Sequence, residues 1–246
     1  MSVPDPAPDT VGATESCANF TLAGVPVLAD PSGALLLPDA RTLVVADLHF
    51  EKGSAFAARG DAWLPPYDTG ATLARLEQVC RQHQPDRIVC LGDSFHDLGG
   101  PGRMAPSDLA RLRRLAARFD WVWITGNHDP APPSDLGGTT AETLAVGPLT
   151  LRHEAATGMV PSGEISGHFH PKATVRTRGR RISGRCFVTD GRRLILPAFG
   201  AFTGGLNVLD PALASLLQPA FRVFVIGKQR LFAYQHHQLT PEPPRV

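Results

Sequence analysis

Carboxylate, imidazole and amide side chains recur at the ends of short apolar runs in this sequence. Their donor atoms suit divalent ions such as Mn²⁺, Fe²⁺ or Zn²⁺ rather than a structural zinc site built from cysteine. The set holds too many ligands for one ion with an open coordination position, but enough for two ions. It comprises Asp47, His49, Asp93, Asn127, His128, His153, His168 and His170.

Two cations a few ångströms apart repel each other, and an anion between them offsets that repulsion. Asp93 follows Gly92 at the end of an apolar run, and it is the natural candidate for such a bridging ligand. The residue types therefore predict a site for two divalent ions.

Buried strands are needed to bring these side chains together. The apolar runs at 43–46, 88–91, 121–124 and 149–151, and a weaker run at 164–166, have the length and β-branched content of strands. Apolar residues at helical spacing between them predict helices over 69–83 and 107–119. Strands that alternate with helices favour an α/β fold with a largely parallel sheet, whose functional groups gather beyond the carboxyl ends of the strands.

The rest of the chain sets the expected domain organisation. We expect disordered tails at 1–16 and 240–246 and a single domain over 17–239. Within it, 17–170 is the portion of alternating strands and helices, and 171–239 reads as β-rich, with a hairpin inside 221–234. A length of 246 residues allows one large domain or two small ones.

Charge is unevenly distributed along the chain. The formal net charge is +1, which argues against a protein that holds nucleic acid by its total positive charge. Residues 1–150 nevertheless carry a net charge of −7 and residues 151–246 a net charge of +8. The positive charge is concentrated in an arginine-rich stretch, 172–193, directly after His170.

Cysteine usage and apolar runs exclude several other classes. Cys17, Cys80, Cys90 and Cys186 are scattered without a C-x-x-C pair, so we expect reduced thiols rather than a cysteine-zinc site. The N-terminus lacks the features of a signal peptide, and no apolar run is long enough to span a membrane. We therefore expect a cytoplasmic protein without a membrane contact.

The ordered motifs resemble a known family. Asp47-x-His49, Gly92-Asp93, Gly126-Asn127-His128-Asp129, His153 and Gly167-His168-x-His170 resemble the five signature blocks of the calcineurin-like metallophosphoesterases. The resemblance implies a β-sandwich flanked by helices, with a dinuclear metal site at the carboxyl ends of the strands. It implies two ligand sets that share Asp93, one with Asp47, His49 and His170, the other with Asn127, His153 and His168.

The same resemblance gives His128 a role other than metal binding. The ring would face the substrate phosphate, oriented by the adjacent Asp129, and would donate a proton to the leaving oxygen or stabilise its charge. Two metal ions would neutralise the phosphoryl oxygens and supply a hydroxide nucleophile.

A closer resemblance extends over residues 40–210. Segments 47–53, 64–69, 92–97 and 197–205 are similar to the bacterial ligase-associated DNA damage response phosphoesterases. This resemblance implies a Mn²⁺-dependent DNA endonuclease or phosphodiesterase that acts in DNA repair with an ATP-dependent DNA ligase, a helicase and an exonuclease. Fe²⁺, Zn²⁺ and Mg²⁺ remain alternative metals.

Several residues near the motifs carry two interpretations each. One interpretation of Lys52 is that it contacts a substrate phosphate, and the other is that it forms a surface pair with Glu51. For His96 and Asp97, the alternatives are that they orient a metal ligand or that they belong to a plain loop. For the arginine-rich stretch, the first interpretation is that it binds a DNA backbone without sequence specificity. The second is that it forms the solvated face of a hairpin. Its candidate phosphate-binding residues are Arg176, Arg178, Arg180 and Arg181.

The sequence thus predicts a two-metal phosphodiesterase, with DNA as its substrate. One alternative is an enzyme of small substrates, such as cyclic nucleotides or nucleotide-linked compounds. The other is a non-catalytic scaffold of the same fold, which is disfavoured because such scaffolds lose metal ligands that are all present here.

Overall fold

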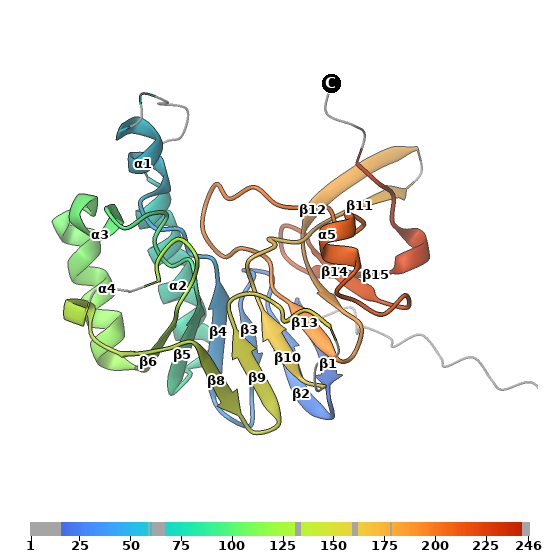
Figure 1. Ribbon diagram of the computed structural model, residues 1–246, viewed down its shortest axis with the longest axis horizontal. Coiled ribbons are helices and arrows are strands. Elements are labelled where there is room, and N and C mark those ends of the chain that lie inside the picture. The colour runs from blue at the N-terminus through green and yellow to red at the C-terminus, as the bar shows by residue number, and fades with distance from the viewer. Residues whose placement is uncertain are drawn as a thin grey trace, which may run out of the picture.

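The computed structural model describes residues 16–58, 60, 67–130, 134–158, 162–177 and 179–242, in which strands form two sheets packed face to face (Figure 1). The first sheet has the order β1 (Ala18–Leu22), β2 (Val25–Ala29), β3 (Leu35–Leu37), β4 (Thr42–Ala46), β5 (Arg87–Leu91), β6 (Asp120–Ile124), β7 (Thr139–Ala141). The second has the order β15 (Leu231–Gln235), β14 (Arg222–Ile226), β12 (Arg180–Thr189), β13 (Arg193–Ile195), β10 (Glu164–Ser166), β9 (Leu149–Arg152), β8 (Thr143–Val146), and β11 (Lys172–Thr177) pairs with β12.

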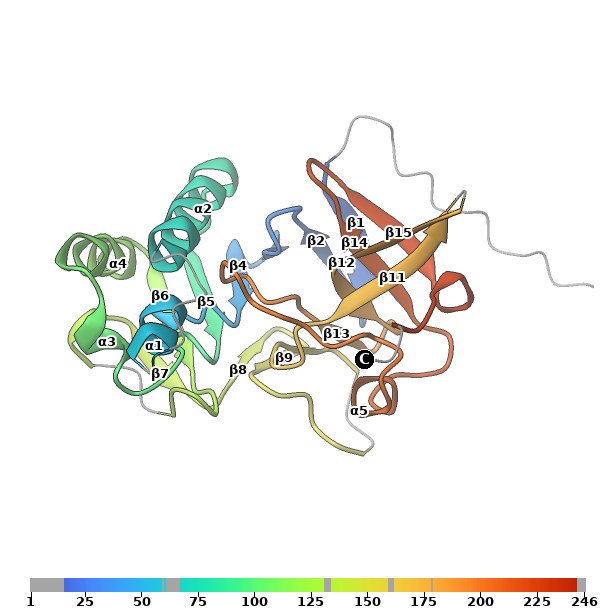
Figure 2. The ribbon, with the colours of Figure 1, turned by 90° about the horizontal axis from the view of Figure 1, so that it is seen from above.

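Helices cover the outer faces of the sandwich. They are α1 (Lys52–Ala58), α2 (Asp68–His83), α3 (Gly100–Arg103), α4 (Pro106–Arg118) and α5 (Pro211–Ala214), with 3₁₀ turns at Ser134–Leu136 and His236–Gln238. Seen from above, α2 and α4 lie at one end of the molecule, and α5 and the β11–β12 hairpin lie at the other (Figure 2). Of the described helices, none has the length and apolar character needed to cross a membrane.

Three apolar layers hold this arrangement together. Between the sheets, buried side chains of β4 and β5, such as Val44 and Leu91, belong to one cluster with Ile165 and Phe187 of the second sheet. Leu76 of α2 belongs to the cluster on the other face of the first sheet, and α5 contributes to a third cluster on the second sheet. Burial of these faces drives the packing, and the predicted α/β sandwich flanked by helices is confirmed.

The local predictions agree with the described elements over the central part of the chain. The apolar runs coincide with β4, β5, β6, β9 and β10, and the helical patterns coincide with α2 and α4 to within a residue or two. The sheets are less parallel than expected. β4 to β7 run parallel, but β1 to β4 are connected as antiparallel neighbours, because turns as short as 23–24 and 38–41 allow no crossover.

The single domain and the two tails stay predictions, and the described residues show how their boundaries lie in the fold. Strands from both sides of residue 171 pair in the second sheet, as β10 does with β13. Residues 1–15 and 243–246 lie outside the described residues. The inner ends of both predicted tails are bonded to strands, since Leu231 donates to the Ser16 carbonyl and Thr240 donates to that of Thr174.

Candidate metal centre

The loops that follow β4, β5 and β10 hold the predicted ligands in an unusual backbone conformation. Five ligand residues have a positive φ, a region that costs a residue with a side chain about 1–3 kcal/mol. Such strain persists where the surroundings over-determine the backbone, and it is concentrated here on metal-ligand candidates. These residues are Asp47 (φ 53°), His49 (φ 44°), Asp93 (φ 46°), His168 (φ 68°) and His170 (φ 47°).

Hydrogen bonds and two glycines hold these loops against one another. The His49 amide donates to the Asp93 carbonyl at 2.9 Å, and the His168 amide donates to Asp47 Oδ2 at 3.0 Å. A Cβ on Gly92 would collide with the His153 ring, and one on Gly126 would collide with the backbone of Asp93. The glycines of the motifs are therefore required by close approach of the ligand loops.

One donor cluster consists of Asp47, His49 and His170. His49 Nε2 lies 3.2 Å from His170 Nε2, and His170 Nε2 lies 3.5 Å from Asp47 Oδ1. Burial, together with the nearby His170 and Lys52, lowers the pKa of His49 to about 2. The His49 ring is therefore neutral, as a metal ligand must be, and a cation is the group that suits this convergence of two imidazoles on a carboxylate.

The second donor cluster consists of Asp93, His153 and His168, with Asn127 beside it. His153 Nδ1 donates to the Leu91 carbonyl at 2.9 Å, so its Nε2 presents a lone pair. That Nε2 lies 2.9 Å from Asn127 Oδ1, 3.1 Å from His168 Nδ1 and 3.5 Å from Asp93 Oδ2. Several acceptor atoms thus converge on one point, which fits a bound cation.

The two clusters adjoin each other. Asp47 Oδ1 of the first lies 3.8 Å from His153 Nδ1 of the second. Among the described residues, Asp93 groups with the second cluster, and its bridging role stays a prediction. The seven predicted ligands are therefore brought to one edge of the sandwich from segments that are far apart in the sequence.

His128 lies beside the second cluster with its ring partly exposed. Its Nδ1–H donates to the His96 carbonyl at 3.0 Å, and its Nε2 lies 4.0 Å from Asp93 Oδ2. The ring also stacks on the His96 ring, with centroids 5.5 Å apart, and His96 stacks in turn on Phe56. This arrangement leaves Nε2 as the ring nitrogen directed to the metal centre.

Asp129 does not orient His128 in the way that we expected. Its Oδ2 accepts hydrogen bonds from the amides of Ser94 and Phe95, at 2.8 and 3.2 Å. The side chain is buried, and burial raises the pKa of Asp129 to about 7. The carboxyl group therefore shapes the loop after β5, while the His96 carbonyl holds the His128 ring.

The other predicted neighbours of the centre take different places. Lys52 begins α1, partly buried and close enough to His49 to influence its pKa. Glu51 is not its surface partner, because Glu51 is buried and accepts from Thr69 Oγ1 at 2.8 Å. Asp97 accepts from Arg103 at 2.7 Å, so its contacts close the 97–103 loop rather than orient a ligand.

The predicted arginines lie on the β11–β12 hairpin. Arg176 pairs with Arg181 across the hairpin, Arg180 lies next to them, and all three are exposed. Arg178 lies outside the described residues. At about 3.3 Å per residue, Arg176 lies about 20 Å along an extended strand from His170, so the hairpin does not place these side chains on the metal ligands.

Two features of the centre were missed in the sequence. Glu154 directly follows His153, and its Oε1 lies 3.8 Å from His168 Nε2. The second is the course of the 199–205 loop along the ligand loops, where the Gly200 amide donates to the Asp47 carbonyl at 3.2 Å. The position of Glu154 next to a ligand was the available signal.

Comparisons with known proteins agree with this geometry. The family model described as calcineurin-like phosphoesterase matches residues 40–176, more than half of the chain. None of the curated proteins compared with the chain matches it.

The solved structures that are similar to the chain include a nuclease and a phosphoesterase. The nuclease MPE of Pseudomonas putida is 28% identical, with a TM-score of 0.67 over 89% of this chain and 100% of that one. The phosphoesterase Yfce of E. coli is 15% identical, with a TM-score of 0.40 over 80% of this chain and 98% of that one. With its two donor clusters and the family match, the chain belongs to the calcineurin-like phosphoesterases, hydrolases of phosphoester bonds whose fold binds two divalent metal ions.

Proposed function

We propose that this protein is a two-metal phosphodiesterase that cleaves DNA, as a Mn²⁺-dependent endonuclease of DNA repair. The observation that carries the proposal is the pair of adjoining donor clusters with His128 Nε2 directed to them. The similarity to the nuclease MPE supports a nucleic acid as the substrate.

The first cluster and the second would each hold one divalent ion. Such ions neutralise phosphoryl oxygens and supply a hydroxide near neutral pH. The protein's own contribution is to hold the donors in place by the strained loops and to keep the His49 ring neutral by burial.

His128 is the proposed proton donor to the leaving oxygen. Because its Nδ1–H is engaged by the His96 carbonyl, the proton available for transfer is on Nε2. The ring must therefore be an imidazolium to act as an acid, and it returns to the neutral Nδ1–H tautomer after transfer.

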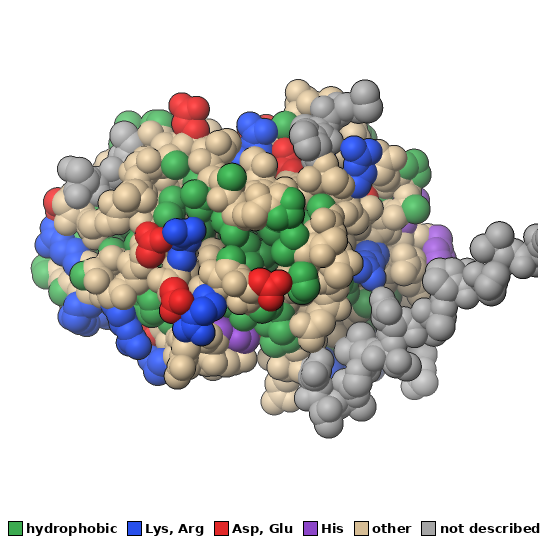
Figure 3. All heavy atoms as spheres, turned by 90° about the horizontal axis from the view of Figure 1, so that it is seen from below, with side chains coloured by type: hydrophobic (Ala, Val, Ile, Leu, Met, Phe, Trp, Pro, Cys, Tyr) green, Lys and Arg blue, Asp and Glu red, His purple; other side chains and the backbone are tan. Residues whose placement is uncertain are grey.

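DNA would be held by exposed arginines that lack carboxylate partners. Among the described residues, no carboxylate lies within ion-pair distance of Arg176, Arg180 or Arg181. A second gathering of basic side chains lies at the left end of Figure 3, where Figure 1 places α4. There, Arg111 pairs with Glu77 and Asp108, and Arg113 pairs with Asp135, so much of that charge is already neutralised.

The length of the hairpin further supports a polymeric substrate. A strand of duplex DNA advances 3.4 Å per base pair, so the about 20 Å of extended chain between His170 and Arg176 corresponds to roughly six base pairs. A mononucleotide cannot span that distance, whereas a DNA strand can. The proposal includes cytoplasmic action beside an ATP-dependent DNA ligase, a helicase and an exonuclease, for which the similarity of the sequence motifs is the support.

The test is a panel of metals against several substrates. Mn²⁺, Fe²⁺, Zn²⁺ and Mg²⁺ are each supplied to metal-free protein, with single-stranded, duplex and circular DNA and a small chromogenic diester, and the His128→Ala protein is the blank. We expect Mn²⁺ to support cleavage of circular DNA and DNA to compete with the small diester. If circular DNA stays intact with every metal, the protein is not an endonuclease. If DNA does not inhibit turnover of the small diester, the result favours an enzyme of small substrates.

A further inference from the structure

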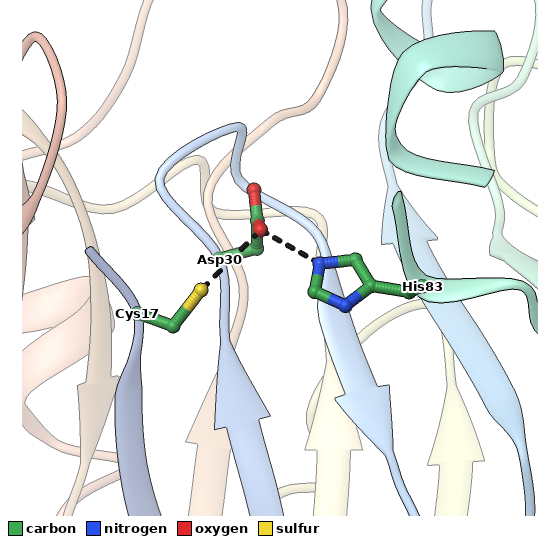
Figure 4. A group of neighbouring side chains, drawn as sticks. All are labelled: Cys17, Asp30 and His83. Atoms are coloured by element: carbon green, nitrogen blue, oxygen red, sulfur yellow. Dashed lines mark hydrogen bonds and ion pairs between the residues drawn. The ribbon is translucent and has the colours of Figure 1, made fainter. Parts of the chain in front are cut away.

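A separate group of donor side chains lies outside the metal centre. Cys17 precedes β1, Asp30 follows β2, and His83 ends α2. Because Ala18 pairs with Ala29 in the antiparallel β1–β2 ladder, Cys17 and Asp30 are the next residues along the two strands and lie side by side. Figure 4 shows the side chains of all three residues pointing toward one another.

The distances bring a thiol, a carboxylate and an imidazole to one point. Cys17 Sγ lies 3.5 Å from Asp30 Oδ2, and His83 Nε2 lies 2.8 Å from the same oxygen. All three donor atoms lie within 4.8 Å of one another. The side chains of Asp30 and His83 are largely shielded from water, with 7% and 11% of their surface exposed.

The supporting contacts hold the carboxylate in a ligand-like orientation. Asp30 Oδ1 accepts from the Ser32 amide at 2.8 Å, so Oδ2 is the oxygen directed to Cys17 and His83. Such outer hydrogen bonds are what orient metal ligands in proteins.

The donor set matches the chemistry of zinc. Tetrahedral Zn²⁺ bonds sulfur at about 2.3 Å, and nitrogen and oxygen at about 2.0–2.2 Å, which places neighbouring ligand atoms about 3.3–3.6 Å apart. The Cys17–Asp30 separation already fits, and the Asp30–His83 pair would open by about half an ångström. Three protein ligands leave one position for water.

We propose that Cys17, Asp30 and His83 form a third divalent-cation site, selective for Zn²⁺, that joins the β1–β2 edge of the first sheet to the C-terminal end of α2. The site shares no residue with the two donor clusters of the metal centre, and it does not depend on the proposed nuclease function. A thiolate ligand distinguishes it from that centre, whose predicted ligands are carboxylate, imidazole and amide groups.

This chemical difference provides the test. Metal-free protein is titrated with Co²⁺ in a buffer that contains a phosphine reductant. The thiolate-to-cobalt charge-transfer absorption in the near ultraviolet is recorded. We expect a band that saturates at the intensity of one cobalt–thiolate bond per protein, that is lost in Cys17→Ser and that is weakened in His83→Gln. Added Zn²⁺ should bleach the band, and His237→Gln, a change of an exposed histidine, should keep it.

Two results would overturn the site. One is a cobalt-saturated parent protein without a thiolate band, and the other is a band that survives in Cys17→Ser. If a variant fails to fold, as judged by circular dichroism, the parent protein itself is alkylated with and without Zn²⁺, and the Cys17 peptide is followed by mass spectrometry. Zn²⁺ should slow alkylation of Cys17 at least tenfold, and equal rates would reject the proposal.

Discussion

The metal-centre edge and the β11–β12 hairpin hold their ionisable side chains in opposite environments. At the edge, ionisable side chains such as Asp47 and Asp93 are buried, held by backbone hydrogen bonds and crowded against like acceptors. On the hairpin, Arg176 and its neighbours are exposed to water. The first region stores local strain to place charge at the metal centre, and the second leaves its charge exposed, as the proposed binding of DNA requires.

Mutations in these two regions should therefore differ in how much function they remove. A buried donor in a converging cluster has no substitute, because neighbouring donors are positioned around the same cation. An exposed arginine of the proposed DNA-binding hairpin would contribute one phosphate contact among several, so its removal would weaken binding only in part.

The largest effect is expected from removal of a metal donor. Asp93→Asn should reduce turnover of a chromogenic diester by about 10³-fold or more, since the metal ions account for several kcal/mol of the barrier. Elemental analysis should show reduced metal content, and chelation of the parent protein should give the same loss, reversible by Mn²⁺. Asp120→Asn, an exposed aspartate of β6, is the matched control. Full activity of metal-free protein would contradict the assignment.

His128→Ala should come next, with a loss of about 10²–10⁴-fold in kcat, the usual range for a positioned acid. Metal content should remain that of the parent, because His128 is held by His96 and lies outside both donor clusters. The measurement is kcat at saturating Mn²⁺ together with elemental analysis. Equal turnover of variant and parent would exclude the proton-donor role.

Replacement of the hairpin arginines should weaken DNA binding without changing hydrolysis at the metal centre. Arg176, Arg180 and Arg181, changed together to alanine, should reduce the slope of log affinity against log salt by up to about 2–3 on duplex DNA. Turnover of the small diester should not change. The matched control is the variant in which Arg113, Arg114 and Arg118 of α4 are changed together to alanine. An unaltered salt slope in the hairpin variant would mean that the hairpin arginines are only a solvated surface.

The smallest effect is expected at Asp97. Its pair with Arg103 is partly exposed, so Asp97→Asn should lower the free energy of unfolding by about 1 kcal/mol or less, measured by urea denaturation. The kcat should stay at the parent value, because Asp97 contacts the 99–103 segment rather than a ligand. A large loss of kcat in a folded variant would restore the role in ligand orientation that its position after Asp93 suggested.

Much of the centre was predictable because its signals are local. Apolar runs such as 88–91 end where buried strands end, and polar residues that follow them in a parallel arrangement meet at one edge. The directions of two side chains could not be predicted from their positions in the sequence. Asp129 follows His128 but turns to the amides of Ser94 and Phe95, and Asp97 turns to Arg103.

Composition and apolar periodicity are properties of short segments, so the amino-acid sequence specifies which donor atoms are available, in which order they occur and at which strand ends they lie. Tertiary contacts bring Asp47, His49 and His170 together with a positive φ at each residue, and they bring Cys17 and His83 to Asp30. Such encounters depend on long-range packing, in which burial of two sheets and their covering helices balances local strain that no single segment can specify.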